Sequence, residues 1–89
     1  MDRDNMIVID CTNIKNKQQL HQLLAKELSF PSYYGHNLDA LMDCLTDIRR
    51  DTVICLRGWD ALGDWKAGFG ETFADASAED PHLTFVYEP

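Results

Sequence analysis

Ile7-Val8-Ile9 near the start of the chain and Val53-Ile54-Cys55-Leu56 in its middle are unbroken apolar runs. Such runs are typical of strands that are covered on both faces of a sheet, and we expect the first run to form a central strand. Leu83-Thr84-Phe85-Val86-Tyr87 has the composition of a further strand. Because long helical stretches separate these runs, we expect the strands to pair in parallel through crossover connections.

Two segments between the first two strand runs carry helical signals. Asn16, followed by Gln19, predicts a capped helix start, and Pro31 makes continuation past Phe30 unfavourable. Asn37 is a good N-cap for a second helix of about three turns. The apolar positions of the two helices are Leu20, Leu23, Leu24 and Leu28 in the first, and Leu38, Leu41 and Leu45 in the second.

Aromatic residues dominate the segment after the second strand run. Trp59, Leu62 and Trp65 predict a short helix that Gly63 interrupts, and Phe69, Phe73 and Ala76 predict a last helix ending near Asp80-Pro81. The expected fold is therefore α/β, with a three-stranded parallel sheet flanked by about four helices. We expect residues 1–89 to form a single domain.

The charge balance restricts the ligand classes. The 89 residues carry 15 acidic and 8 basic side chains, for a net charge of -7. Phosphates would be repelled by the net charge, which argues against nucleic acid and anionic membranes as direct ligands. A basic partner is favoured unless the charge only maintains solubility. No secretory signal or membrane-spanning apolar run is present, which predicts a soluble, cytoplasmic protein. Cys11, Cys44 and Cys55 have no metal-site spacing and are expected to be reduced.

The second predicted helix has one acidic face. A helical wheel places Asp39, Asp43 and Asp47, together with Thr46, opposite the leucine stripe. Tyr33 and Tyr34 precede this helix, and two tyrosines beside an acidic face are typical of a protein-binding patch. Gly35 would allow a sharp turn and a close approach of a partner.

The segment Tyr33-Tyr34-Gly35-His36-Asn37-Leu38-Asp39-Ala40-Leu41-Met42-Asp43-Cys44-Leu45-Thr46 resembles the barstar family of ribonuclease inhibitors. Leu20-His21-Gln22 and Lys26-Glu27-Leu28, together with the order of strands and helices, extend the similarity over nearly the whole chain. The resemblance implies a barstar-like fold without catalytic activity. It also implies a one-to-one intracellular complex with a basic ribonuclease of the barnase type, formed by a monomer that needs no metal or other cofactor.

The resemblance also implies roles for individual residues. Tyr33 would pack on the catalytic histidine of the enzyme, while Asp39 and Asp43 would engage its phosphate-binding arginines and lysine. Asp75 falls at another acidic contact of the family. The complete implied surface is Tyr33, Tyr34, Gly35, Asn37, Leu38, Asp39, Met42, Asp43, Thr46 and Asp75.

Two other hypotheses remain open. Asp39, Asp43 and Asp75 could form an acid–base site or a site for magnesium or calcium, although no nucleophile, histidine spacing or phosphate loop accompanies them. The chain could also be an acidic module that uses a barstar fold to bind another basic protein. Met42 stands where the family has tryptophan, and Arg49 and Arg50 add positive charge beside the acidic face, which predicts a partner with an acidic or neutral rim.

Overall fold

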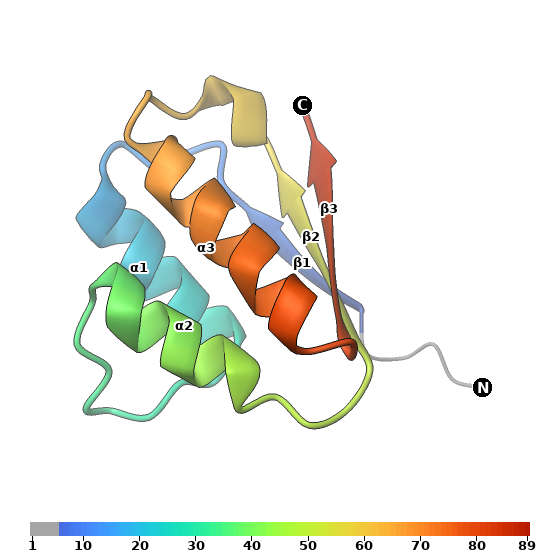
Figure 1. Cartoon of the computed structure of the whole chain (residues 1–89). Coiled ribbons are helices and arrows are strands. Elements are labelled where there is room, and N and C mark those ends of the chain that lie inside the picture. The colour runs from blue at the N-terminus through green and yellow to red at the C-terminus, as the bar shows by residue number, and fades with distance from the viewer. Residues whose placement is uncertain (1–5) are drawn as a thin grey trace.

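The computed structural model describes residues 6–89, which form one three-stranded parallel sheet in the order β1-β2-β3 with helices packed against it (Figure 1). This arrangement confirms the α/β class and the parallel pairing. The elements in chain order are β1 (Met6–Asp10), α1 (Lys17–Glu27), α2 (Leu38–Thr46), β2 (Thr52–Arg57), the 3-10 helix η1 (Trp59–Ala61), α3 (Lys66–Glu79) and β3 (Leu83–Glu88).

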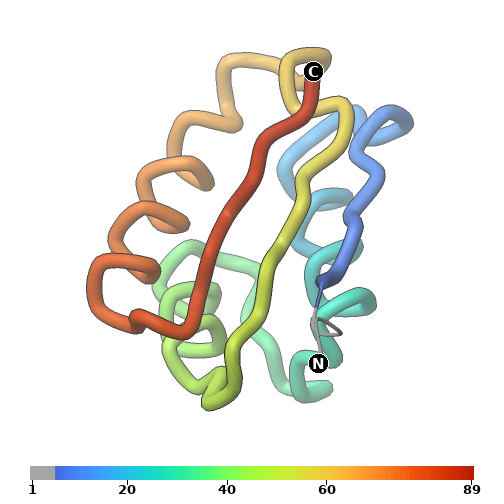
Figure 2. Tube along the Cα trace, turned by 90° about the vertical axis from the view of Figure 1, so that its right-hand side faces the viewer, coloured from blue at the N-terminus to red at the C-terminus, as the bar shows by residue number. Residues whose placement is uncertain are grey.

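The strand order corrects one prediction. β2 lies in the centre and pairs with both neighbours, whereas β1, which contains Ile7-Val8-Ile9, is an edge strand. Both crossovers advance in the same direction across the sheet. Right-handed crossovers of this kind place their helices on the same face. Figure 2 shows this result, with all the helices behind the three strands.

Within residues 6–89, no helix covers the other face of the sheet, which corrects the expectation that both faces are buried. The register places Val8, Cys55 and Val86 in one row across this open face. Val8 is 41% exposed and Val86 38%, whereas Cys55 in the central strand is fully buried. The β-branched residues of the edge strands thus reflect strand propensity and not burial on both sides.

The first two helices begin where their caps predict. The side-chain oxygen of Asn16 accepts a hydrogen bond of 2.9 Å from the backbone N–H of Gln19, and Leu20 and Leu24 are fully buried. The helix ends at Glu27, well before Pro31. The cap and the leucine spacing were therefore sufficient to locate α1.

The segment after β2 forms a single 3-10 turn in place of the fourth helix that we predicted. Gly58 has a φ of 76°, a left-handed conformation that ends the strand and starts η1. Trp59 then packs on Tyr87 of β3, with ring centroids 5.0 Å apart. Trp59 therefore lies on a turn of three residues, and Trp65 stands at the N-cap position of α3, so the two tryptophans do not share a helix.

The core lies between the sheet and the three α-helices. Phe73 is fully buried and stacks on Phe85 of β3 at 4.6 Å, and Phe69 and Ala76 lie on the same side of α3. These residues confirm the predicted buried face of the last helix. The three cysteines are free thiols. None of the helices within residues 6–89 combines the length and the apolar character needed to cross a membrane.

Candidate partner-binding surface

The surface of α2 is divided as the helical wheel predicts. Leu41 and Leu45 are fully buried against the core, whereas the three aspartates of the helix face are exposed: Asp39, Asp43 and Asp47. Leu38 differs from the prediction, because it is 37% exposed at the start of the helix and does not belong to the core stripe. The acidic residues lie one turn apart, so they form a single charged ridge along α2.

A tight turn fixes the beginning of this ridge. The side-chain oxygen of Asn37 accepts a hydrogen bond of 2.8 Å from the N–H of Ala40, and its amide nitrogen donates to the carbonyl of Gly35. The left-handed residue of the turn is His36, with a φ of 54°, and not Gly35. A Cβ at position 35 would lie 3.1 Å from the amide nitrogen of Asn37, so a larger residue there would require the capping side chain to shift slightly.

The two tyrosines before the turn have different environments. Tyr33 is 85% exposed, which makes its ring available to a partner. Tyr34 is only 7% exposed, and its hydroxyl forms a hydrogen bond of 2.7 Å with Nδ1 of His21 on α1. Tyr34 therefore presents little surface, and it fixes the loop that carries Tyr33.

His21 is the internal support of this loop. Its side chain is 4% exposed and packs on Phe69, and its ring lies parallel to that of His36. Burial lowers the pKa of His21, and the neighbouring His36 and Lys17 lower it further. Burial likewise raises the pKa of Tyr34. Both groups are thus neutral, which suits a hydrogen bond inside the core.

The acidic ridge borders a cleft of about 400 Å³ that the sequence did not reveal. Asp43 and Asp47 line it from the end of α2, and Tyr33 lines it from the loop before α2; we call this space the acidic cleft. Its remaining lining is contributed mainly by apolar residues: Leu28, Ser29, Phe30, Pro31, Cys44 and Ile48. The signal that could have found it is Phe30-Pro31, a large apolar residue and a proline in a segment that helix α1 does not reach.

The other predicted contacts lie around this cleft and on α3. Thr46 is half-buried, and its hydroxyl donates to the carbonyl of Met42, within the same helix. Met42 is half-buried and packs against the core. Asp75 is exposed on α3, the helix that packs against α2, but it does not line the acidic cleft.

The two arginines after α2 have different surroundings. Arg49 lines a second cleft together with Glu79 and Asp80 from the end of α3, so acidic groups lie near its charge. Arg50 is exposed; within residues 6–89 its side chain forms no hydrogen bond, and its backbone carbonyl accepts one from the hydroxyl of Thr52. The positive rim that we predicted beside the acidic ridge is therefore concentrated at Arg50.

The hypothesis of a metal or acid–base site finds little support in the geometry. Within the described part of the chain, no three histidine, cysteine, aspartate or glutamate side chains are grouped so that they could hold a metal ion. Asp39, Asp43 and Asp75 come from two helices and line no common cavity among those found.

Comparison with known proteins identifies the family. A sequence model described as "Barstar (barnase inhibitor)" matches residues 5–85, which include the acidic ridge and the loop before it. The chain belongs to the barstar family. One relative from Bacillus subtilis (strain 168), named "Putative ribonuclease inhibitor YrdF", is 37% identical over 75 residues. These residues are 83% of this chain and 74% of the relative. The barstar match thus begins before β1 and ends within β3.

Proposed function

We propose that this chain inhibits a basic ribonuclease of the barnase type, that it binds the enzyme one-to-one through the acidic ridge and Tyr33, and that it catalyses no reaction. The observation that carries the proposal is the acidic cleft, whose lining combines two carboxylates one helical turn apart, an exposed tyrosine and several apolar residues. Membership of the barstar family and the name of the Bacillus subtilis relative, "Putative ribonuclease inhibitor YrdF", support the same role.

The chemistry of the acidic cleft matches what a ribonuclease exposes. An enzyme that cleaves RNA must hold phosphates with arginine, lysine or histidine groups, and a carboxylate can take the place of a phosphate at these groups. An arginine side chain fits the cleft especially well. Its guanidinium would pair with Asp43 and Asp47, and its flat face and aliphatic stem would pack on Tyr33 and Phe30.

The supporting contacts make this surface rigid before binding. The Asn37 cap fixes the first turn of α2, and the bond between Tyr34 and His21 fixes the loop before it. A surface that is already ordered loses less conformational entropy on binding, which increases affinity. Asp39, Leu38 and Gly35 would extend the contact at one end of the ridge. Met42, Thr46 and Asp75 would extend it toward α3.

The test is a titration of a purified barnase-type ribonuclease with the whole chain. We expect activity to fall linearly to zero at a one-to-one ratio. Asp43→Ala should raise the dissociation rate strongly, because it leaves cations of the enzyme buried without a partner. The control is Asp60→Ala, since Asp60 is also exposed but lies on η1. Equal inhibition by Asp43→Ala and Asp60→Ala would show that α2 is not the binding surface.

The same titration separates inhibition from simple interaction. A panel of basic ribonucleases that all keep full activity, together with Asp43-dependent binding of another basic protein, would replace inhibition with the function of an acidic interaction module. Added magnesium or calcium should leave the thermal midpoint of the free chain unchanged, whereas the metal-site hypothesis requires stabilisation. We further propose that the free protein is a cytoplasmic monomer, which sedimentation and cell fractionation can test.

A further inference from the structure

Another pocket, of about 550 Å³ and distinct from the two clefts described above, lies where the first turns of all three α-helices meet. Lys17 and Gln18 contribute from α1, Leu38 and Asp39 from α2, and Trp65, Gly68 and Phe69 from α3. Figure 1 shows that the three helices begin near one another on the side of the helical layer away from the sheet.

Two of the three helix ends, those of α1 and α3, bring partial positive charge to this pocket without an acidic residue to offset it, in a chain of net charge -7. Each helix N-terminus carries a partial positive charge and backbone N–H groups without a partner in the helix. Neither α1 nor α3 has an acidic residue in its first turn; each begins instead with a lysine, Lys17 or Lys66. A lysine at this position is unfavourable for the isolated helix, and an anion would offset that cost.

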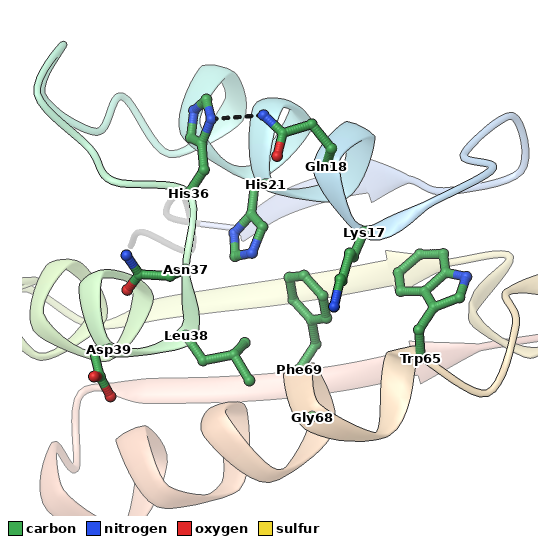
Figure 3. Close-up of a pocket in the computed structure, with 10 residues that line it drawn as sticks. All are labelled: Lys17, Gln18, His21, His36, Asn37, Leu38, Asp39, Trp65, Gly68 and Phe69. Atoms are coloured by element: carbon green, nitrogen blue, oxygen red, sulfur yellow. Dashed lines mark hydrogen bonds between the residues drawn. The ribbon is translucent and has the colours of Figure 1, made fainter.

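The side chains provide donors at the same place. Figure 3 shows the ammonium group of Lys17 in the space between His21, Phe69 and Trp65. His21 is 4% exposed, and its bond to Tyr34 uses Nδ1. Its Nε2 has no hydrogen-bond partner among residues 6–89. In the tautomer in which the tyrosine hydroxyl donates to Nδ1, the proton of the neutral imidazole is on Nε2, where it can donate to a ligand.

The remaining charged groups near the pocket do not cancel this bias. Asp39 lies at the edge, and Figure 3 shows its carboxylate turned away from Lys17 and His21. Lys66 contacts the carbonyl of Leu62 and does not line the pocket. Apolar walls complete the site: Trp65 is half-buried, and Leu38 is 37% exposed.

We propose that this pocket binds a nucleoside monophosphate or a phosphate monoester of similar size with a flat ring. The phosphate lies against Lys17, Nε2 of His21 and the amides at the starts of α1 and α2 that the Asn16 and Asn37 caps leave free, and the ring packs on Trp65. Phosphates at helix N-termini and rings on tryptophan faces are both favourable arrangements. This pocket shares no lining residue with the acidic cleft, although Leu38 and Asp39 belong both to its edge and to the proposed partner-binding surface. The inference does not depend on inhibition of a ribonuclease.

The experiment is calorimetric titration of the whole chain with uridine monophosphate, uridine and inorganic phosphate at matched ionic strength. We expect the monophosphate to bind most tightly, since neither of the other probes fills both halves of the pocket. Lys17→Ala should weaken binding about tenfold, because it removes one charge-assisted hydrogen bond. The matched control is Lys26→Ala, which removes a lysine from the last turn of the same helix. The imidazole resonances of His21 should shift on titration of the unmodified chain.

Three results would overturn the proposal. The first is the absence of binding at millimolar monophosphate. The second is equal weakening by Lys17→Ala and Lys26→Ala, which would indicate nonspecific attraction. The third is an affinity for uridine or for inorganic phosphate that equals the affinity for the monophosphate. The first equality would show that the phosphate contributes nothing to binding, and the second would show that the ring contributes nothing. Circular dichroism of the two lysine variants establishes that both remain folded.

Discussion

Replacement of Tyr34 by phenylalanine removes one oxygen atom from the centre of the loop support. The lost group is a hydroxyl that forms a 2.7 Å hydrogen bond to Nδ1 of His21, and the two residues are 7% and 4% exposed. A buried hydrogen bond contributes about 1 kcal/mol, and the ring nitrogen left without a partner costs about 1 kcal/mol more. We therefore expect the free energy of unfolding to fall by about 2 kcal/mol.

Urea unfolding at neutral pH, followed by circular dichroism, measures this change. The midpoint should fall while the slope with urea stays constant, and the thermal midpoint should drop by roughly 10 °C for a domain of this size. Tyr33→Phe is the matched control, because it removes the same atom from the adjacent residue, which is 85% exposed. That variant should stay within about 0.5 kcal/mol of the unmodified chain.

The result that refutes this reasoning is a Tyr34→Phe variant as stable as Tyr33→Phe. It would mean that water or a rearranged His21 satisfies the ring nitrogen at no cost. A loss of stability without any loss of partner affinity would refute a narrower claim, namely that the bond orders the Tyr33 loop for binding. Both measurements use the same pair of variants.

Three further predictions follow from single contacts. The pKa of His21 in the folded chain lies below its unfolded value of about 6.5, so the unfolded chain binds more protons and stability should fall as the pH decreases below that value. The urea midpoint of His21→Gln should depend less steeply on pH than that of the unmodified chain. Equal slopes would contradict a lowered pKa of His21. Gly58→Ala should destabilise the chain by about 1–2 kcal/mol, because φ is 76° and the new Cβ would lie 2.6 Å from the side chain of Thr12. The control is Gly70→Ala, whose new Cβ would meet nothing closer than 3.8 Å. This variant should be neutral or stabilising in the same urea assay. Arg50→Glu should accelerate association with barnase at low salt but not at high salt, and an unchanged rate in stopped-flow measurements would exclude a role of this exposed charge in partner choice.

Local signals located most of the helices and strands. Asn16 and Asn37 marked two helix starts because a short polar side chain at that position satisfies N–H groups that the helix itself leaves free. The leucine spacing of α2 separated the core side from the acidic side for the same kind of reason, since the period of a helix is fixed by its backbone. The acidic ridge could therefore be predicted from residues that are close in sequence.

Contacts between distant segments were not predictable in this way. The acidic cleft forms because the residues after α1 return to the side of α2, so that Phe30 lies near Asp43 and Asp47. Tyr34 was assigned to the surface because tyrosine is common at interfaces, but His21 from the preceding helix holds it in the core. The predicted fourth helix is absent for a similar reason. Trp59 is buried against Tyr87 of the distant strand β3, and a turn of three residues is enough to place it there.

The sequence by itself determined the α/β class, the parallel pairing, the helix caps and the acidic face of α2, because each of these follows from local backbone geometry and side-chain periodicity. Only the tertiary structure decided that β2 is central, that one face of the sheet is open, and that three helix starts converge on one pocket. An apolar run indicates that a strand will be buried, but the direction of the crossovers decides which strand pairs on both sides. For that reason Ile7-Val8-Ile9 and Val53-Ile54-Cys55-Leu56, similar in composition, occupy an edge and the centre of the same sheet.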